Sequence, residues 1–196
     1  MLVMEQQAID PLAEAAAFVN PEKGVETPGE ALAGARDIIA EWTAEDAGTR
    51  QAVRRLFFTD GFMESRVAKG KEETAGKYEN YFQWQEPVKS APSHRVLAML
   101  RGENEGFLKV SIRPDEARAL PLVKRRFVKN TNPASEEVAA AVEDGYVRLL
   151  APSIETDVRR RVKERADSEA LRVFARNLRD MLMAPPLGQR PVLGID

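Results

Sequence analysis

The sequence predicts a mainly α-helical protein, a multi-helical domain with a small two-stranded β element near residues 62–68 and 107–112. Three observations lead to this class. Apolar residues recur at the three- and four-residue spacing of amphipathic helices over most of the 196 residues. Only two short stretches alternate apolar and polar side chains, which is the period of a half-buried strand. A hydrophobic fraction of 43% beside 31% charged residues is typical of a globular chain.

The first sixty residues are expected to form three helices. A short one covers Leu12–Val19, and Thr27-Pro28 begins the second. The Thr43 hydroxyl and the Asp46 carboxyl, three residues later, resemble a capping box and predict that a third helix begins there. Gly61 is expected to end that helix.

The stretch Pro92–Arg113 predicts a helix followed by a strand. Ser93 is a good N-cap, and Gly102 is expected to supply a left-handed C-terminal stop. Alternating apolar residues then mark the strand: Leu108, Val110 and Ile112. Because a strand must find partners for its backbone groups, we expect it to pair with Phe62–Ala68.

Proline positions divide the second half of the chain into helices. Pro114-Asp115 begins one, and Pro121 inside it predicts a kink or an early end near Ala119. A linker at residues 130–133 is expected to form a boundary. Ser135–Leu150 then forms a helix that Ala151-Pro152 is expected to end.

The last apolar pattern, Ser153–Met183, changes phase along its length. At about 100° per residue, one side of the helix holds the first apolar group: Ile154, Val158 and Val162. The second group lies on roughly the opposite side: Leu171, Phe174, Leu178 and Met181. Since one straight helix cannot bury both sides against the same core, the sequence predicts two helices broken near Asp167, with Asp167 capping the second.

Charge and composition narrow the classes of function. The net charge is −2, so the chain has no overall positive charge to attract nucleic acid. The charge is uneven, at −6 over residues 1–60 and +3 over residues 157–196. The absence of cysteine excludes disulfides and thiolate zinc sites and fits a cytoplasmic location. No apolar run approaches the ~20 residues that span a bilayer, so no membrane partner is expected.

Two groups of basic residues are candidates for nucleic-acid binding. Lys124, Arg125 and Arg126 lie at a helix end, where cations also interact favourably with the helix dipole. Arg172, Arg176 and Arg179 form a stripe opposite the second apolar group of the last helix. A solvated helix face is the alternative for this stripe, beside phosphate contact or domain docking.

Other motifs favour structural roles. His94 is the only histidine, and no nucleophile-elbow, zinc-protease or phosphate-loop pattern is present. Four clustered aromatic residues suit core packing better than base stacking: Tyr78, Tyr81, Phe82 and Trp84. We therefore expect no catalytic residue, no metal site and no cofactor.

Long segments of the sequence resemble the bacterial Tex family of transcription accessory proteins. They are VAKGKEETAGKYENYF, RGENEGFLKVSI and the stretch from LLAPSIETDVRRRV to the C-terminus. The resemblance implies a truncated N-terminal helical region over residues 1–130 and a helical connection over residues 131–190. It also implies that residues 191–196 are the first strand of an RNase H/resolvase-like domain, with Asp196 at the leading carboxylate.

The resemblance implies a role in transcription with RNA or DNA as partner of the full-length protein, and only weak binding by this fragment. Transcription machinery is a further candidate partner. We expect a helical scaffold without enzymatic activity. Two alternatives stay open, a subdomain of an RNase H-type nuclease and a protein-interaction module that does not bind nucleic acid.

Overall fold

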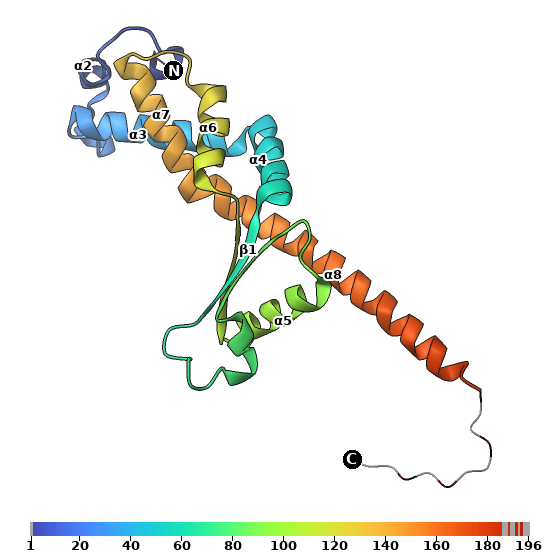
Figure 1. The fold of residues 1–196 in the computed structure, drawn as a ribbon. Coiled ribbons are helices and arrows are strands. Elements are labelled where there is room, and N and C mark those ends of the chain that lie inside the picture. Colours follow the sequence, from blue (N-terminus) through green and yellow to red (C-terminus); the bar gives the residue numbers. More distant parts are fainter. Residues whose placement is uncertain (1, 186–187, 189–190, 192, 194–196) are drawn as a thin grey trace.

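The computed structural model describes residues 2–185 together with residues 188, 191 and 193. The molecule is elongated, with helices gathered at one end and a small sheet beside the long last helix (Figure 1). We call these parts the helical lobe and the sheet lobe. The prediction of a mainly α-helical chain with a small β element is confirmed.

The helical lobe is built from six helices. They are α1 (Leu2–Glu5), α2 (Pro11–Ala15), α3 (Pro28–Glu45), α4 (Ala47–Asp60), α6 (Glu116–Phe127) and α7 (Pro133–Gly145). Thr27 begins α3 with a complete capping box. Thr43 begins no helix, contrary to expectation: it is buried inside α3 and donates to the Ile39 carbonyl at 2.9 Å. Asp46 instead caps α4.

Pro121 does not interrupt α6, so the predicted kink or end near Ala119 is wrong. Proline removes the hydrogen bond to the carbonyl four residues earlier. That carbonyl belongs to Ala117, which is exposed along with Pro121 itself, so water can replace the missing donor. The inner side of α6 keeps Ala119 and Val123 buried.

Gln6 ties the N-terminus to the stretch between α6 and α7. This residue is 1% exposed and adopts the left-handed conformation, with φ at 53°. Its side chain donates to the Phe127 carbonyl at 2.6 Å and accepts from the Lys129 N–H at 2.7 Å. The side chains of Asn130 and Asn132 donate to its carbonyl. The boundary expected near residue 130 stays a prediction, and Gln6 contacts residues on both sides of it.

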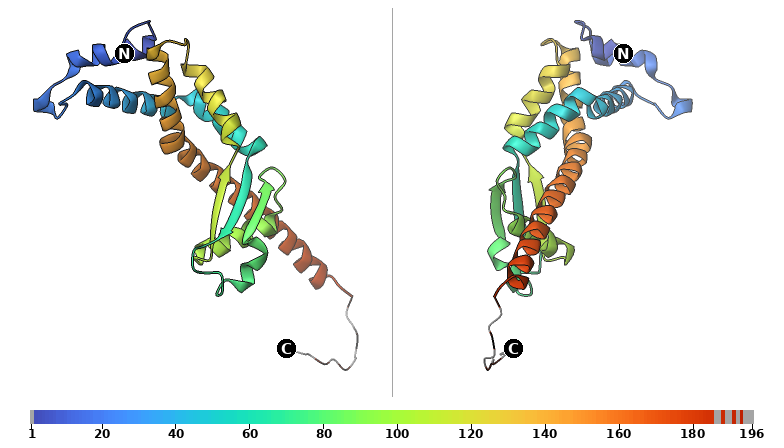
Figure 2. Two further views of the ribbon diagram at one scale, coloured as in Figure 1. Left: turned by 60° about the vertical axis from the view of Figure 1, so that its left-hand side comes forward. Right: turned by 90° about the vertical axis from the view of Figure 1, so that its right-hand side faces the viewer.

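The sheet has three antiparallel strands in the order β2-β1-β3. They are β1 (Phe62–Val67), β2 (Gln83–Pro87) and β3 (Leu108–Arg113). The predicted pairing of β1 with β3 is confirmed, with Ser65 opposite Val110. The sequence reading missed β2, which pairs along the other side of β1. Figure 2 shows the three strands side by side with the last helix passing next to them.

Helix α5 (Ser93–Asn104) packs against β3, and two expectations about its ends are wrong. Pro92 takes the N-cap position, while the Ser93 hydroxyl donates to Glu169 on the last helix. Gly102 lies inside the helix, where a Cβ would stand 2.6 Å from the Leu108 side chain. Close packing therefore requires this glycine, and Gly106, at φ 75°, makes the left-handed turn.

The helical path continues from α7 through η4 (Tyr146–Leu150), a π-helical turn, into α8 (Ala151–Leu182). The expected end at Ala151-Pro152 is therefore wrong, because the wider π turn absorbs the change in hydrogen bonding that Pro152 imposes. The expected break near Asp167 is also wrong, since α8 is continuous. Asp167 lies inside α8, and its carboxylate pairs with Lys163, one turn earlier, at 2.5 Å. The strand expected from Val192 lies largely outside the described residues.

Side chains of the helices occupy the free edge of β3. The N–H of Val110 donates to Glu103 at 3.1 Å, and the N–H of Ile112 donates to Glu155 at 2.8 Å. The Arg159 guanidinium donates to the Val110 carbonyl and pairs with Glu103. An open strand edge is a site of unwanted pairing, so these groups protect the sheet and fix it to α8.

Candidate nucleic-acid interface

The arginine stripe lies on the part of α8 that extends beyond the sheet lobe. Its members are Arg172, Arg176 and Arg179, and all three are exposed. Within the part of the chain that the structure describes, the ion pairs of α8 involve residues up to Asp167 and none of these arginines. Three guanidinium groups on one side of a helix can contact successive phosphates of a nucleic acid.

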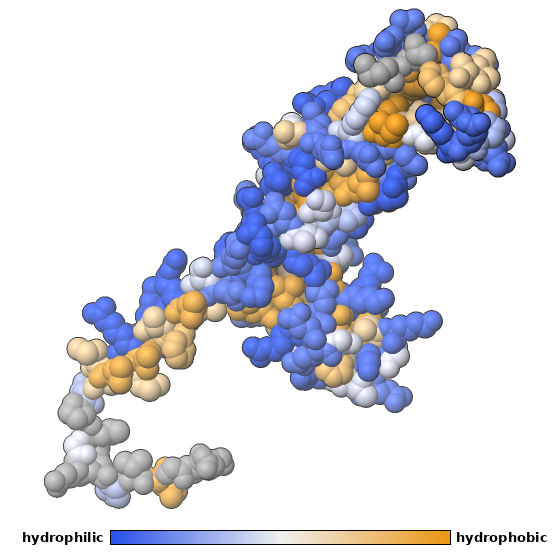
Figure 3. Space-filling model, turned by 180° about the vertical axis from the view of Figure 1, so that it is seen from behind, coloured by the Kyte–Doolittle hydropathy of each residue, from blue (hydrophilic) through white to orange (hydrophobic). Residues whose placement is uncertain are grey.

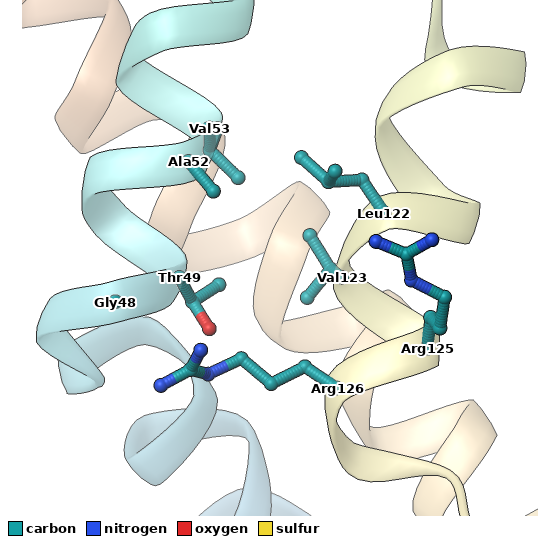
Figure 4. Close-up of a pocket in the computed structure, with 8 residues that line it drawn as sticks. All are labelled: Gly48, Thr49, Ala52, Val53, Leu122, Val123, Arg125 and Arg126. Atoms are coloured by element: carbon teal, nitrogen blue, oxygen red, sulfur yellow. The ribbon is translucent and has the colours of Figure 1, made fainter.

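The second basic group is largely occupied by contacts within the protein. Lys124 pairs with Glu143 of α7 at 2.6 Å, and Arg126 pairs with Asp46 at 2.8 Å. Arg125 and Arg126 line a hollow of about 270 Å³ between α4 and α6, over an apolar floor that includes Val53 and Val123 (Figure 4). Lys124 and Arg126 thus make ion pairs within the protein, and their contact with nucleic acid stays a prediction.

Asp46 pairs with Arg126, one of the residues that line that hollow. Burial raises the pKa of its carboxyl, but hydrogen bonds from Thr49 and the Arg126 guanidinium outweigh this and leave the pKa lowered. The backbone N–H and the hydroxyl of Thr49 donate to Asp46 at 2.6 Å and 2.7 Å. The carboxylate therefore joins the start of α4 to the end of α6 through its ion pair with Arg126.

The aromatic cluster packs within the sheet lobe, as the sequence favoured. Tyr78 is 6% exposed, and its ring lies 5.9 Å from that of Phe107. Trp84 is half-buried on β2, with the Arg95 guanidinium 5.0 Å from its ring. A stacking platform needs a row of exposed ring faces for successive bases. Side chains held in this way do not provide such a row.

Candidate catalytic groups do not converge in the described ranges. His94 is exposed on α5, and no group of three or more histidine, cysteine, aspartate or glutamate residues is placed to hold a metal ion there. Glu169 is hydrogen-bonded to Ser93. Asp196 is not among the described residues.

The sequence reading also missed an exposed apolar surface on the same end of α8. Leu171 is 68% exposed, Phe174 is 64% exposed and Met181 is 73% exposed. The phase change in the apolar pattern was the signal for this surface, although it was read as a helix break. None of the helices found among the described residues is long and apolar enough to cross a membrane.

Comparison with known proteins gives a consistent result. Residues 6–174 match the family described as Tex central region-like. Protein YhgF of Escherichia coli is 38% identical over 95% of this chain and 25% of its own length. The transcriptional accessory protein Tex of Neisseria gonorrhoeae is 34% identical over 100% of this chain and 26% of its own length.

A more distant relative is the human S1 RNA-binding domain-containing protein 1, which is 23% identical over 91% of this chain and 19% of its own length. The chain thus spans about a quarter of the bacterial relatives named above. The family match covers most of the described helices and all three strands. The chain belongs to the Tex central region-like family.

Proposed function

We propose that this chain is the helical scaffold portion of a Tex-like transcription accessory protein that binds nucleic acid. The observation that carries the proposal is the position of α8, which packs against α4 of the helical lobe and against α5 and β3 of the sheet lobe. A single long helix that contacts both lobes holds them at a fixed separation. Such a spacer suits a protein that must place several binding elements along a nucleic acid.

The names of the relatives support the nucleic-acid part of the proposal. One is named a transcriptional accessory protein, and another is named for an S1 RNA-binding domain. Binding by this chain itself is expected to be weak and electrostatic, because the net charge is −2 and only three arginines form the exposed stripe. A cytoplasmic location and contact with transcription machinery remain predictions of the same proposal.

Salt dependence tests the arginine stripe directly. If Arg172, Arg176 and Arg179 neutralise at most three phosphates, log K against log salt on duplex DNA has a slope no steeper than roughly −3. Changing all three to glutamine removes most of that slope. The matched control changes three paired cations of the same helix to glutamine: Arg160, Arg161 and Lys163. Equal loss in both triple variants would refute a specific role for the stripe, and salt-resistant binding would refute the electrostatic account.

The scaffold proposal assigns no reaction to this chain, whereas the nuclease alternative does. RNase H-type cleavage needs several carboxylates converging on divalent cations. The chain is incubated with RNA, DNA and a four-way junction in Mg²⁺ and in Mn²⁺, and no cleavage is expected. Cleavage that survives repurification and disappears in Asp196→Asn would establish the nuclease alternative instead.

A further inference from the structure

An apolar hollow lies in the helical lobe, beside α3. Its volume is about 640 Å³, and its walls come from α2, from the short helix η1 (Ala16–Phe18) and from the side of α3 between Ala31 and Trp42. Three large side chains that line it are nonetheless exposed: Phe18 at 62%, Ile38 at 49% and Trp42 at 42%. Figure 3 shows apolar surface on the helical lobe, at the opposite end of the molecule from the protruding end of α8. Contiguous exposed apolar surface of this kind marks an interaction site.

The hollow has the form of a groove along α3. At about 100° per residue, Ala31, Ala35, Ile38 and Trp42 lie within about 60° of one another and form one row. The row is about 17 Å long, which is the length of a helix of about twelve residues. An added Cβ at Gly34, beside the row, would meet nothing of the surrounding protein within 4 Å, so space is open there. A row of apolar and small side chains at helical spacing can receive the apolar side of a second helix.

The rim of the groove is acidic. Glu14 and Glu30 line it directly. Two further glutamates, Glu41 and Glu45, are exposed and lie about 60° around α3 from the apolar row. Residues 1–45 together carry nine acidic and two basic side chains, and one of the two basic ones, Arg36, already pairs with Glu137 of α7. We call this site the acidic groove, because its floor is apolar and its rim is negative.

We propose that the acidic groove binds a basic amphipathic helix of a partner protein. The length of the row admits about twelve residues of that helix, with three or four apolar side chains at helical spacing turned toward α3. Lysine or arginine on the flanks of this apolar side would face the four glutamates of the rim. The aromatic side chains of Phe18 and Trp42 suit such a contact, because aromatic residues are enriched in protein interfaces and tryptophan is frequent among the residues that dominate binding.

The charge of the rim selects among the classes of occupant. Nucleic acid has a negative phosphate backbone and a membrane surface carries anionic lipid, so the glutamates repel both. A second copy of this chain has a net charge of −2 and brings no overall positive charge to the rim. A protein segment that combines an apolar side with basic flanks fits both the floor and the rim.

The inference deepens the proposed scaffold function, because it gives the chemistry of a protein partner, and it rests on that function. The acidic groove lies in the helical lobe, whereas the arginine stripe lies on the part of α8 beyond the sheet lobe. A protein partner and a nucleic acid would therefore bind at separate places on one scaffold. Substitutions at one place should leave binding at the other unchanged.

Peptide binding to the full-length protein tests the groove. The probe is a fluorescent peptide of about fourteen leucine and lysine residues, with the leucines on one side of a helix. Its affinity is measured for wild type, for Ile38→Lys in the groove, and for Ala33→Lys, which makes the same charge change at an exposed position on the opposite side of α3. We expect binding at least about tenfold weaker in Ile38→Lys and within about twofold of wild type in Ala33→Lys. Thermal unfolding reports the fold of each variant, and Trp42→Ala replaces Ile38→Lys if that variant does not fold.

The charge of the rim is tested with a second peptide that has glutamate in place of every lysine. It is expected to bind wild type at least about tenfold more weakly than the lysine peptide. This preference should shrink when Glu14, Glu41 and Glu45 are changed together to glutamine. The matched control changes three exposed acids of the sheet lobe to glutamine: Glu72, Glu73 and Glu79. Equal binding of the two peptides by wild type would overturn the basic character of the partner.

Two results would overturn the groove as a binding site. One is equal loss of affinity in Ile38→Lys and Ala33→Lys. The other is a wild-type protein that does not bind the lysine peptide, because the groove is then filled by its own chain or, if the measured mass is doubled, by a second copy. Nucleic-acid binding measured on the same sample judges the proposed function separately. Intact nucleic-acid binding without peptide binding overturns the groove alone.

Discussion

The two halves of α8 use opposite sides of one helix. From Ala151 to Ala166 the buried side holds Ile154, Val158 and Val162, each at most 2% exposed. Beyond Asp167 most of the apolar residues lie on the other side and are largely exposed: Leu171, Phe174, Leu178, Met181 and Leu182. A change of phase in an apolar pattern therefore marks a change of partner, and it does not require the backbone to break.

The largest expected difference between the two halves of α8 is the loss of unfolding free energy when a charged residue is introduced. Val158→Glu puts an unpaired carboxylate where the side chain is 0% exposed, and we expect a loss of several kcal/mol of unfolding free energy. Leu171→Glu stays in water and changes the stability of this chain by about 0.5 kcal/mol or less. Urea unfolding of both variants measures the difference. Similar losses in the two would show that the second half packs within this chain.

A neighbouring pair of arginines on the first half sharpens the comparison. Arg159 donates to the Val110 carbonyl and pairs with Glu103, so Arg159→Ala removes the donor to the Val110 carbonyl and the cation beside Glu103, and costs about 1–3 kcal/mol. Among the residues that the structure describes, Arg160 pairs only with Asp157 and Glu164 on its own helix. Arg160→Ala is expected to cost about 0.5 kcal/mol or less. If Arg159→Ala and Arg160→Ala unfold at the same urea concentration, the contact of Arg159 with the β3 edge does not stabilise the fold.

The smallest effect concerns Asp157, which joins α8 to Arg54 of α4 at 2.7 Å. Burial raises its pKa, but hydrogen bonds from Arg54, Arg160 and Arg161 outweigh this and leave the pKa below its ordinary 3.8. A lowered folded-state pKa stabilises the fold above the unfolded-state pKa, and this contribution disappears as pH falls through the folded value. The stability difference from Asp157→Asn should be about 1 kcal/mol at pH 7 and shrink below about pH 4. A difference independent of pH would exclude the carboxylate charge as its source.

Local patterns predicted most of the elements because their causes are local. The helix start at Thr27-Pro28, the β1 and β3 alternation and the apolar sides of the helices depend on nearby residues. β2 was missed because its five residues, QWQEP, carry one half-buried tryptophan and a mostly polar face. Its strand conformation comes from pairing with β1, which is a tertiary effect.

The predictions of helix ends were wrong where tertiary contacts compete with capping for the same side chain. Ser93 and Asp167 both have side chains suited to an N-cap, yet one reaches Glu169 and the other pairs with Lys163. Contacts between distant residues also limit what the sequence predicts about the candidate site. The sequence placed Arg172, Arg176 and Arg179 on one side of a helix, but it could not show that Asp46 pairs with Arg126, since 80 residues separate them.

The central claim is that α8 is one continuous helix across the change of phase. Arg161 and Arg179 are five full turns apart on the same side, which places them about 27 Å apart in a straight α-helix. The chain has no cysteine, so Arg161→Cys/Arg179→Cys accepts two spin labels without background. Pulsed electron spin resonance should give a narrow distance distribution near this separation. A broad distribution, or one centred below about 20 Å, would show a break near Asp167 and contradict the account.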